Sequence, residues 1–164
     1  MLLLLSRRSS GLLALTSSAI RLAAGGPYSH VDIINPRIKR EMFCQPRLDQ
    51  SFIRQVTTGT IIGATAQHGV AVASMIDRVG HQEVRHWPGV DEDAAWGWAK
   101  AQVGKSYDWL GALGVGARRD WQSPDKFSCA ELVVHAAIAG GAKIDPNHAW
   151  FFGPQHVLAM TEAI

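Results

Sequence analysis

The 164 residues of the chain are enough for one domain with its own hydrophobic core, since 47% of them are hydrophobic and 18% are charged. Sixteen basic residues against fourteen acidic ones give a net charge of +2, which argues against a nucleic-acid-binding protein, and no long basic stripe is present. The two cysteines, Cys44 and Cys129, exclude a disulfide scaffold and are expected to be free thiols.

The first 26 residues imitate a targeting segment, because they combine an apolar run with arginines and serines and lack acidic residues. A secretory signal begins with positive charge, whereas here the leucines come first and Arg7 and Arg8 interrupt them. A mitochondrial transit peptide is the better match of the two. We favour a folded segment instead, with a buried strand over Leu2–Leu5 and a helix over Leu12–Ala23. No apolar run is long enough to span a membrane.

Strand patterns occupy the first half of the chain. The segments "YSHVDIIN", "TIIGATAQHGVAVASMI" and "EVRHW" alternate or are rich in β-branched residues, and the second contains a turn near His68. Between the first two segments, residues 36–59 contain two prolines, mixed charge and no clear period, which indicates an extended connection.

Helical patterns follow in the second half, at residues 91–104, 106–121, 128–141 and 152–160. The first begins with an acidic turn and ends at Gly104, as helices commonly do. Because the strands come early and the helices late, the sequence predicts an α+β fold.

Cys129 stands where the polar segment "SPDKFS" meets the apolar run "AELVVHAAIAG". This places the thiol in the first turn of a helix, where the helix dipole favours the reactive thiolate and backbone N–H groups could face an oxyanion. The alternative is a small buried hydrophobic residue, and composition alone does not decide between the two.

A nucleophilic thiol needs a base, normally a histidine. His135 lies six residues further along the same predicted helix, about 9 Å down its axis, and cannot reach Cys129. His30 stands in an apolar strand with Asp32 on its own face, where it is either a satisfied core residue or a catalytic base.

No metal site and no cofactor are expected. The most suggestive histidine pair, His81 and His86, would face opposite sides of one strand. Neither residue therefore offers the convergent ligand set that a metal ion requires.

Four segments together resemble the permuted branch of the NlpC-type papain-like cysteine hydrolases of bacteria and phages. They are "YSHVDII", "GKSYDWLGALG", "RRDW" ahead of "FSCAEL", and "FFGPQHVL". The resemblance spans residues 2–158 and is interrupted at residues 36–59, which look like an insertion. It implies one domain over residues 1–164 with a circularly permuted papain-like fold, in which a small antiparallel sheet packs against helices. In this branch the histidine strand precedes the cysteine helix.

The resemblance carries the nucleophile to Cys129, in "SCAEL", and the catalytic histidine to His30, in "SHV". The family's third residue, which orients the imidazole, aligns with Gly63, and glycine cannot fill that role. The candidates to replace it as the orienting residue are Asp32, on the strand face of His30, and His68, in the same hairpin as Gly63.

Tyr107, in "SYDW", resembles the tyrosine that lines the substrate cleft near the nucleophile, and its alternative reading is a half-buried structural tyrosine. The implied function is a cysteine peptidase or amidase that cleaves an amide or peptide bond through a thioester, with peptidoglycan fragments among the substrates. One alternative is a catalytically silent binding module or virion structural part. Another is a lipid acyl hydrolase or transferase.

The expected partners are a peptide, amide or peptidoglycan-fragment substrate and phage tail or virion proteins, without nucleic acid or a membrane span. The expected location is soluble, cytoplasmic or virion-associated, because the chain carries no convincing signal peptide.

Overall fold

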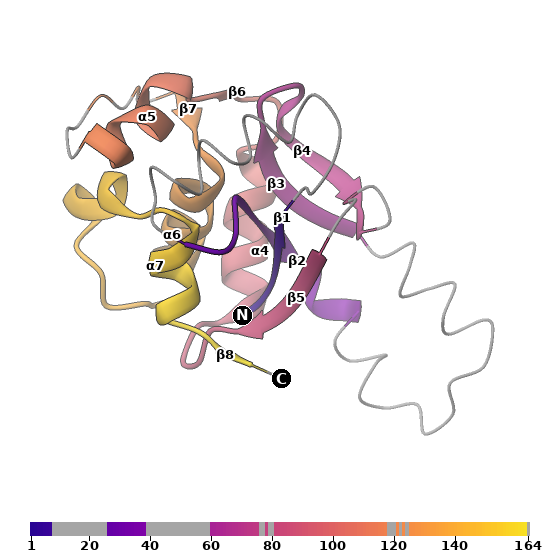
Figure 1. The fold of residues 1–164 in the computed structure, drawn as a ribbon. Helices are drawn as coiled ribbons and strands as arrows, with labels where there is room; N and C mark the ends of the chain where they lie inside the picture. The colour runs from indigo at the N-terminus through magenta and orange to yellow at the C-terminus, as the bar shows by residue number, and fades with distance from the viewer. Residues whose placement is uncertain are drawn as a thin grey trace.

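The computed structural model describes residues 1–7, 26–38, 60–75, 78, 81–117, 121, 123 and 125–163. Within these residues the main sheet has six strands in the order β4-β3-β2-β1-β5-β8, and every neighbouring pair is antiparallel (Figure 1). The strands are β1 (Leu2–Arg7), β2 (His30–Ile34), β3 (Thr60–Thr65), β4 (Gly69–Ser74), β5 (His81–His86) and β8 (Glu162–Ala163).

The helices follow in the second half of the chain. They are α4 (Glu92–Ala101), α5 (Trp109–Ala117), α6 (Cys129–Ala139), the 3-10 helix η2 (Pro146–Phe151) and α7 (Pro154–Ala159). Two short strands, β6 (Ser106–Tyr107) and β7 (Lys126–Phe127), form a separate parallel pair. Helix α6 packs against β2 and β3 on one side and against α4, η2 and α7 on the others. The predicted α+β fold class is confirmed.

Strand β1 lies near the middle of the sheet and is buried on both faces. Leu3 and Leu5 belong to the large core cluster that includes α6, whereas Leu2 and Leu4 belong to a second cluster on the opposite face. The four leucines show no polar alternation because neither face of this strand meets water. The strand predicted at Leu2–Leu5 is confirmed.

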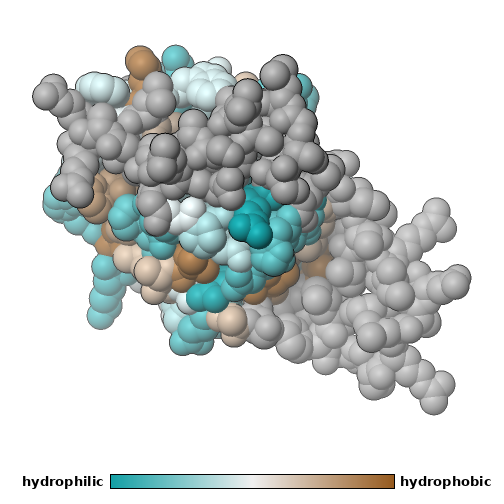
Figure 2. All heavy atoms as spheres, viewed as in Figure 1, coloured by the Kyte–Doolittle hydropathy of each residue, from teal (hydrophilic) through white to brown (hydrophobic). Residues whose placement is uncertain are grey.

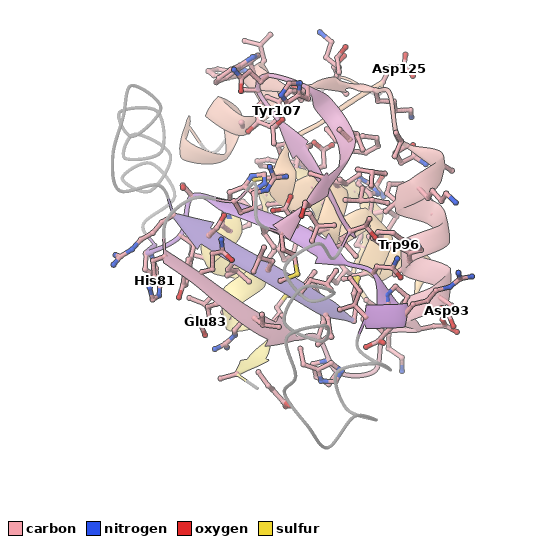
Figure 3. The ribbon with its side chains drawn as sticks, turned by 90° about the vertical axis from the view of Figure 1, so that its right-hand side faces the viewer. His81, Glu83, Asp93, Trp96, Tyr107 and Asp125 are labelled. Carbon is pink, nitrogen blue, oxygen red and sulfur yellow. The ribbon has the colours of Figure 1, made fainter. Side chains whose placement is uncertain are left out.

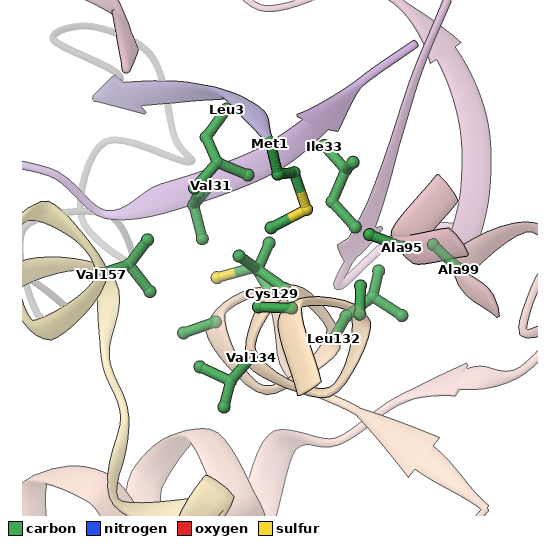
Figure 4. Packing of buried hydrophobic residues seen from close by; sticks show 14 of the residues in the cluster. Met1, Leu3, Val31, Ile33, Ala95, Ala99, Cys129, Leu132, Val134 and Val157 are labelled. Carbon is green, nitrogen blue, oxygen red and sulfur yellow. The ribbon is translucent and has the colours of Figure 1, made fainter. Parts of the chain in front are cut away.

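The main core lies between the sheet and α6. Figure 4 shows Met1, Leu3, Val31 and Ile33 from the sheet side facing Cys129, Leu132 and Val134 of α6, with Val157 of α7 beside the thiol. Nearly the whole first two turns of α6 are buried, so the sheet and its neighbouring helices hold the start of this helix in place.

Several predicted boundaries change. The helical pattern at 106–121 is split into β6 and α5, since Asp108 between them accepts a hydrogen bond from the N–H of Gly111 at 2.8 Å and starts the helix at Trp109. Strand β8 was not predicted, because its two residues follow directly on a helical pattern.

Two predictions fall mainly outside the described residues. The helix expected at Leu12–Ala23 lies outside them altogether. Of the insertion expected at 36–59, the structure describes one helical turn at 36–38 and the beginning of β3 follows at Thr60.

No helix among the described residues is long and apolar enough to cross a membrane. On the face seen in Figure 2, hydrophilic and hydrophobic residues are interspersed.

Candidate active site

His30 is the first residue of β2 and lies near two other side chains of the site. Its Nε2 lies 2.9 Å from Oδ1 of Asp32, and the side chain of Cys129 is close enough to help raise the pKa of the imidazole. Because Asp32 takes Nε2, Nδ1 is the ring nitrogen left for the thiol. The structure thus brings together the thiol, the imidazole and the carboxylate that the sequence had pointed out as candidates.

These contacts favour the charged form of the imidazole. Burial lowers the pKa of His30, but the charge and hydrogen bond of Asp32, followed by those of Cys129, outweigh it and raise the pKa to about 10. An imidazolium beside a thiol is the electrostatic arrangement that stabilises a thiolate.

Asp32 is fully buried and is held by a guanidinium. Arg78 donates from Nε to Oδ2 and from Nη2 to Oδ1, both at 2.7 Å. Burial raises the pKa of Asp32, but His30 and then Arg78 lower it by more than burial raises it. The net shift of the pKa is therefore downward. The carboxylate therefore stays charged next to the imidazole.

Gly63 lies on β3 opposite Asp32, since Ile33 pairs with Ile62 in the register of the two strands. A Cβ atom at position 63 would come within 1.7 Å of Oδ1 and 2.8 Å of Cγ of Asp32. The absence of a side chain at position 63 is what allows the Asp32 carboxylate to lie beside His30.

Cys129 is the first residue of α6, and a reciprocal cap fixes this helix start. The N–H of Ser128 donates to Oε2 of Glu131 at 3.1 Å, and the N–H of Glu131 donates to Oγ of Ser128 at 3.3 Å. The cap does not use the N–H groups of Cys129 and Ala130. Both N–H groups belong to the first turn of the helix, at the positive end of its dipole. Cys129 is buried, with 4% of the residue surface exposed.

Tyr107 lies beside the start of α6, because β6 pairs in parallel with β7, and Tyr107 pairs with Phe127, two residues before Cys129. Burial, the charge of Cys129 and then the charges of Asp108 and Glu131 raise the pKa of Tyr107, so its hydroxyl stays protonated. In Figure 3, Tyr107 lies at the same end of the molecule as Asp125, away from Glu83 on β5.

His68 is an exposed residue of the β3–β4 turn, where its N–H donates to Oγ1 of Thr65 at 3.3 Å. Among the described residues, no hydrogen bond or ion pair joins His68 to His30. Of the two residues considered for the orienting position, Asp32 is the one that contacts the imidazole.

The described ranges contain no group of three or more histidine, cysteine or acidic side chains arranged to hold a metal ion. His81 and His86 lie at the two ends of β5. The ring of His81 stacks on the ring of Tyr28, with the two centroids 6.0 Å apart.

Sequence reasoning missed two features of the site. The cap of α6 carries a recognisable signal, because Ser128 and Glu131 have the spacing of a capping box. Arg78 carries no such signal, since no strand or helix pattern predicts where the segment between β4 and β5 runs.

Comparison of the chain with models of protein families gives no match, and comparison with curated proteins gives none either.

Proposed function

We propose that the chain is a cysteine hydrolase that cleaves an amide or peptide bond through a thioester, with Cys129 as nucleophile, His30 as base and Asp32 as the residue that orients the imidazole. One observation carries the proposal: a single imidazole contacts a buried carboxylate at 2.9 Å and lies near the thiol of a capped helix start, which helps raise its pKa. Nucleophile, base and orienting group in this order are the arrangement of a catalytic triad.

In the proposed reaction His30 holds the proton of Cys129, and the thiolate attacks the carbonyl carbon of the substrate. The N–H of Cys129 donates to the oxyanion of the tetrahedral intermediate. His30 then gives its proton to the leaving amine, and a thioester remains on Cys129. A water molecule, deprotonated by His30, attacks the thioester, and the thiol recovers its proton as the acid is released.

The circularly permuted papain-like arrangement is part of the same proposal. It is supported by the chain order, since the histidine strand precedes the cysteine helix, and by the antiparallel sheet that packs against α6. Tyr107 would then line the substrate cleft, next to the thiol. A peptide from peptidoglycan is the first substrate to test.

A lipid ester is a second candidate substrate, favoured by the apolar surface beside Tyr107. The ring of Trp109 lies 5.1 Å from that of Tyr107, and both Trp109 and Leu110 are largely exposed, Leu110 at 63%. Exposed apolar side chains beside Tyr107 could contact an acyl chain. The reaction steps would be the same, with an alcohol as the leaving group.

The non-catalytic alternative was motivated by the glycine at position 63. The contact between Gly63 and the Asp32 carboxylate gives that glycine a different explanation, since it makes room for an orienting group on the adjacent strand.

The test compares the two thiols of one chain and then the two substrate classes. A thiol-directed electrophile is added to the folded protein, and peptide mass spectrometry follows labelling of Cys129 and Cys44 separately. We expect Cys129 to react faster near neutral pH, and labelling no faster than that of Cys44 would contradict the proposal. Turnover of purified peptidoglycan and of a lipid ester, each with Cys129→Ala as the control, then identifies the substrate class.

A further inference from the structure

Arg78 is the described residue outside the proposed triad that contacts it most directly. Its guanidinium forms two parallel hydrogen bonds with the Asp32 carboxylate, Nε to Oδ2 and Nη2 to Oδ1, each 2.7 Å long. Oδ1 of Asp32 also lies 2.9 Å from Nε2 of His30, within hydrogen-bond distance. One carboxylate oxygen therefore lies between the guanidinium and the imidazole.

The two-point contact fixes more than the charge of Asp32. A carboxylate on a strand can rotate about its Cβ–Cγ bond, and a planar guanidinium that binds both oxygens selects one rotation. In that rotation Oδ1 points at Nε2 of His30. A fully buried carboxylate also needs a permanent positive partner, because the imidazole alone is neutral for part of the reaction cycle.

We infer that Arg78 is a positioning residue of the proposed hydrolase: it holds Asp32 ionised and correctly rotated, so that Asp32 can stabilise the His30 imidazolium when the Cys129 thiolate forms. This inference rests on the proposed function. Arg78 acts through Asp32 and transfers no proton itself, since its guanidinium stays protonated throughout.

Without Arg78, the buried Asp32 would have no fixed cation and would tend to take up a proton. A neutral Asp32 stabilises the imidazolium less, so the pKa of His30 would fall towards its ordinary value of 6.5. The thiolate–imidazolium pair would then be lost at a lower pH than in the unchanged protein.

The experiment uses Arg78→Met, Arg78→Lys and a matched control, Arg85→Met. Arg85 also lies in the sheet region, is equally exposed at 16%, and pairs with Glu83 at 2.8 Å instead of with the site. Two quantities are measured between pH 6.5 and about 10: the alkylation rate of Cys129 by iodoacetamide, resolved from Cys44 by mass spectrometry, and the NMR titration of His30.

We expect Arg78→Met to slow alkylation of Cys129 on the order of tenfold or more near neutral pH and to lower the His30 titration midpoint. Arg78→Lys should lie between Arg78→Met and the unchanged protein, because one ammonium supplies charge without the two-point contact. Arg85→Met should leave both pH profiles unchanged. A purely structural role of Arg78 would lower the thermal stability without shifting either profile.

The inference is overturned if Arg78→Met and Arg85→Met give the same pH profiles while Asp32→Asn shifts them, and the proposed function then stands. If Arg78→Met does not fold, Arg78→Lys decides, and a profile identical to that of the unchanged protein overturns the inference. If Cys129 reacts no faster than Cys44 in the unchanged protein, the proposed function itself fails.

Discussion

The carboxylate of Asp32 occupies the space that a side chain at position 63 would need, since a Cβ on Gly63 would come within 1.7 Å of Oδ1. The two residues face each other on the adjacent strands β2 and β3. In the family pattern that the sequence resembles, the neighbouring strand supplies the orienting side chain. Here Asp32, on the same strand as His30, carries the carboxylate. Gly63 on the neighbouring strand leaves the space that this carboxylate occupies.

The first prediction follows from this contact. Gly63→Ala should displace the Asp32 carboxylate, lower the free energy of unfolding by about 1–3 kcal/mol and reduce the alkylation rate of Cys129. The matched control is Gly97→Ala in α4, where a Cβ would meet nothing within 4 Å. That change should stabilise the helix by about 0.5–1 kcal/mol. Urea unfolding of both variants checks the pair, and equal effects of the two substitutions would refute the steric explanation.

The second prediction separates the two residues considered for the orienting position. Asp32→Asn should lower kcat and leave KM nearly unchanged, because the carboxylate contacts His30 and acts through it. His68→Ala should leave both constants unchanged, since His68 is exposed in the β3–β4 turn. Steady-state kinetics on the substrate that the turnover assay identifies measures both. A loss of kcat in His68→Ala of the size seen in Asp32→Asn would contradict the assignment.

The third prediction concerns the cap of α6. Ser128→Ala and Asp91→Ala each remove a side chain that caps a helix by accepting a backbone N–H bond, at α6 and α4 respectively. Each should cost roughly 0.5–2 kcal/mol of stability. Only Ser128→Ala should also slow alkylation of Cys129, because it loosens the turn that holds the thiol. If both variants, compared at equal fractions folded, react at the unchanged rate, the cap has no part in activating the thiol.

The fourth prediction concerns stability against pH. The pKa of His30 rises from 6.5 to about 10 on folding, so the folded chain binds more protons than the unfolded chain between these values. The stabilisation from His30 is therefore complete below pH 6.5 and is lost as the pH rises through about 10. The pKa of Asp32 is lowered, so its contribution is present above 3.8 and is lost as the pH falls through its folded value.

Urea unfolding of the unchanged protein and of His30→Gln at several pH values measures how the free energy of unfolding depends on pH. The difference between the two chains isolates His30, because His135 and His156, whose pKa values burial lowers, contribute equally to both. A difference that does not change between pH 6.5 and 10 would contradict the coupling of His30 to Asp32.

The local sequence patterns predicted the fold class, the strand that carries His30 and the helix that begins at Cys129. The strand at Leu2–Leu5 was predictable because a run of leucines this short cannot form a stable helix by itself, and the helix at Cys129 was predictable from its polar start and apolar body. The contact between His30 and Cys129 was reachable only through the family resemblance, since nothing local encodes the approach of β2 to α6.

The choice between Asp32 and His68 could not be made from the sequence, because it depends on which side chain fits the space at Gly63. Arg78 was out of reach for a related reason. It meets Asp32 across 46 positions of sequence, from a segment without a helix or strand pattern. Such contacts are decided by tertiary packing, and the residues around Arg78 carry no periodic signal that would predict this one.

His30 and Asp32 are two positions apart on β2, while Arg78 and Cys129 both come after the connection between β2 and β3. A chain divided within that connection would give two fragments, the first with the imidazole and its carboxylate, the second with the thiol and the guanidinium. Neither fragment would contain a complete reactive centre. Reassociation of the two pieces would restore it, so the rate of Cys129 alkylation would report directly on fragment complementation.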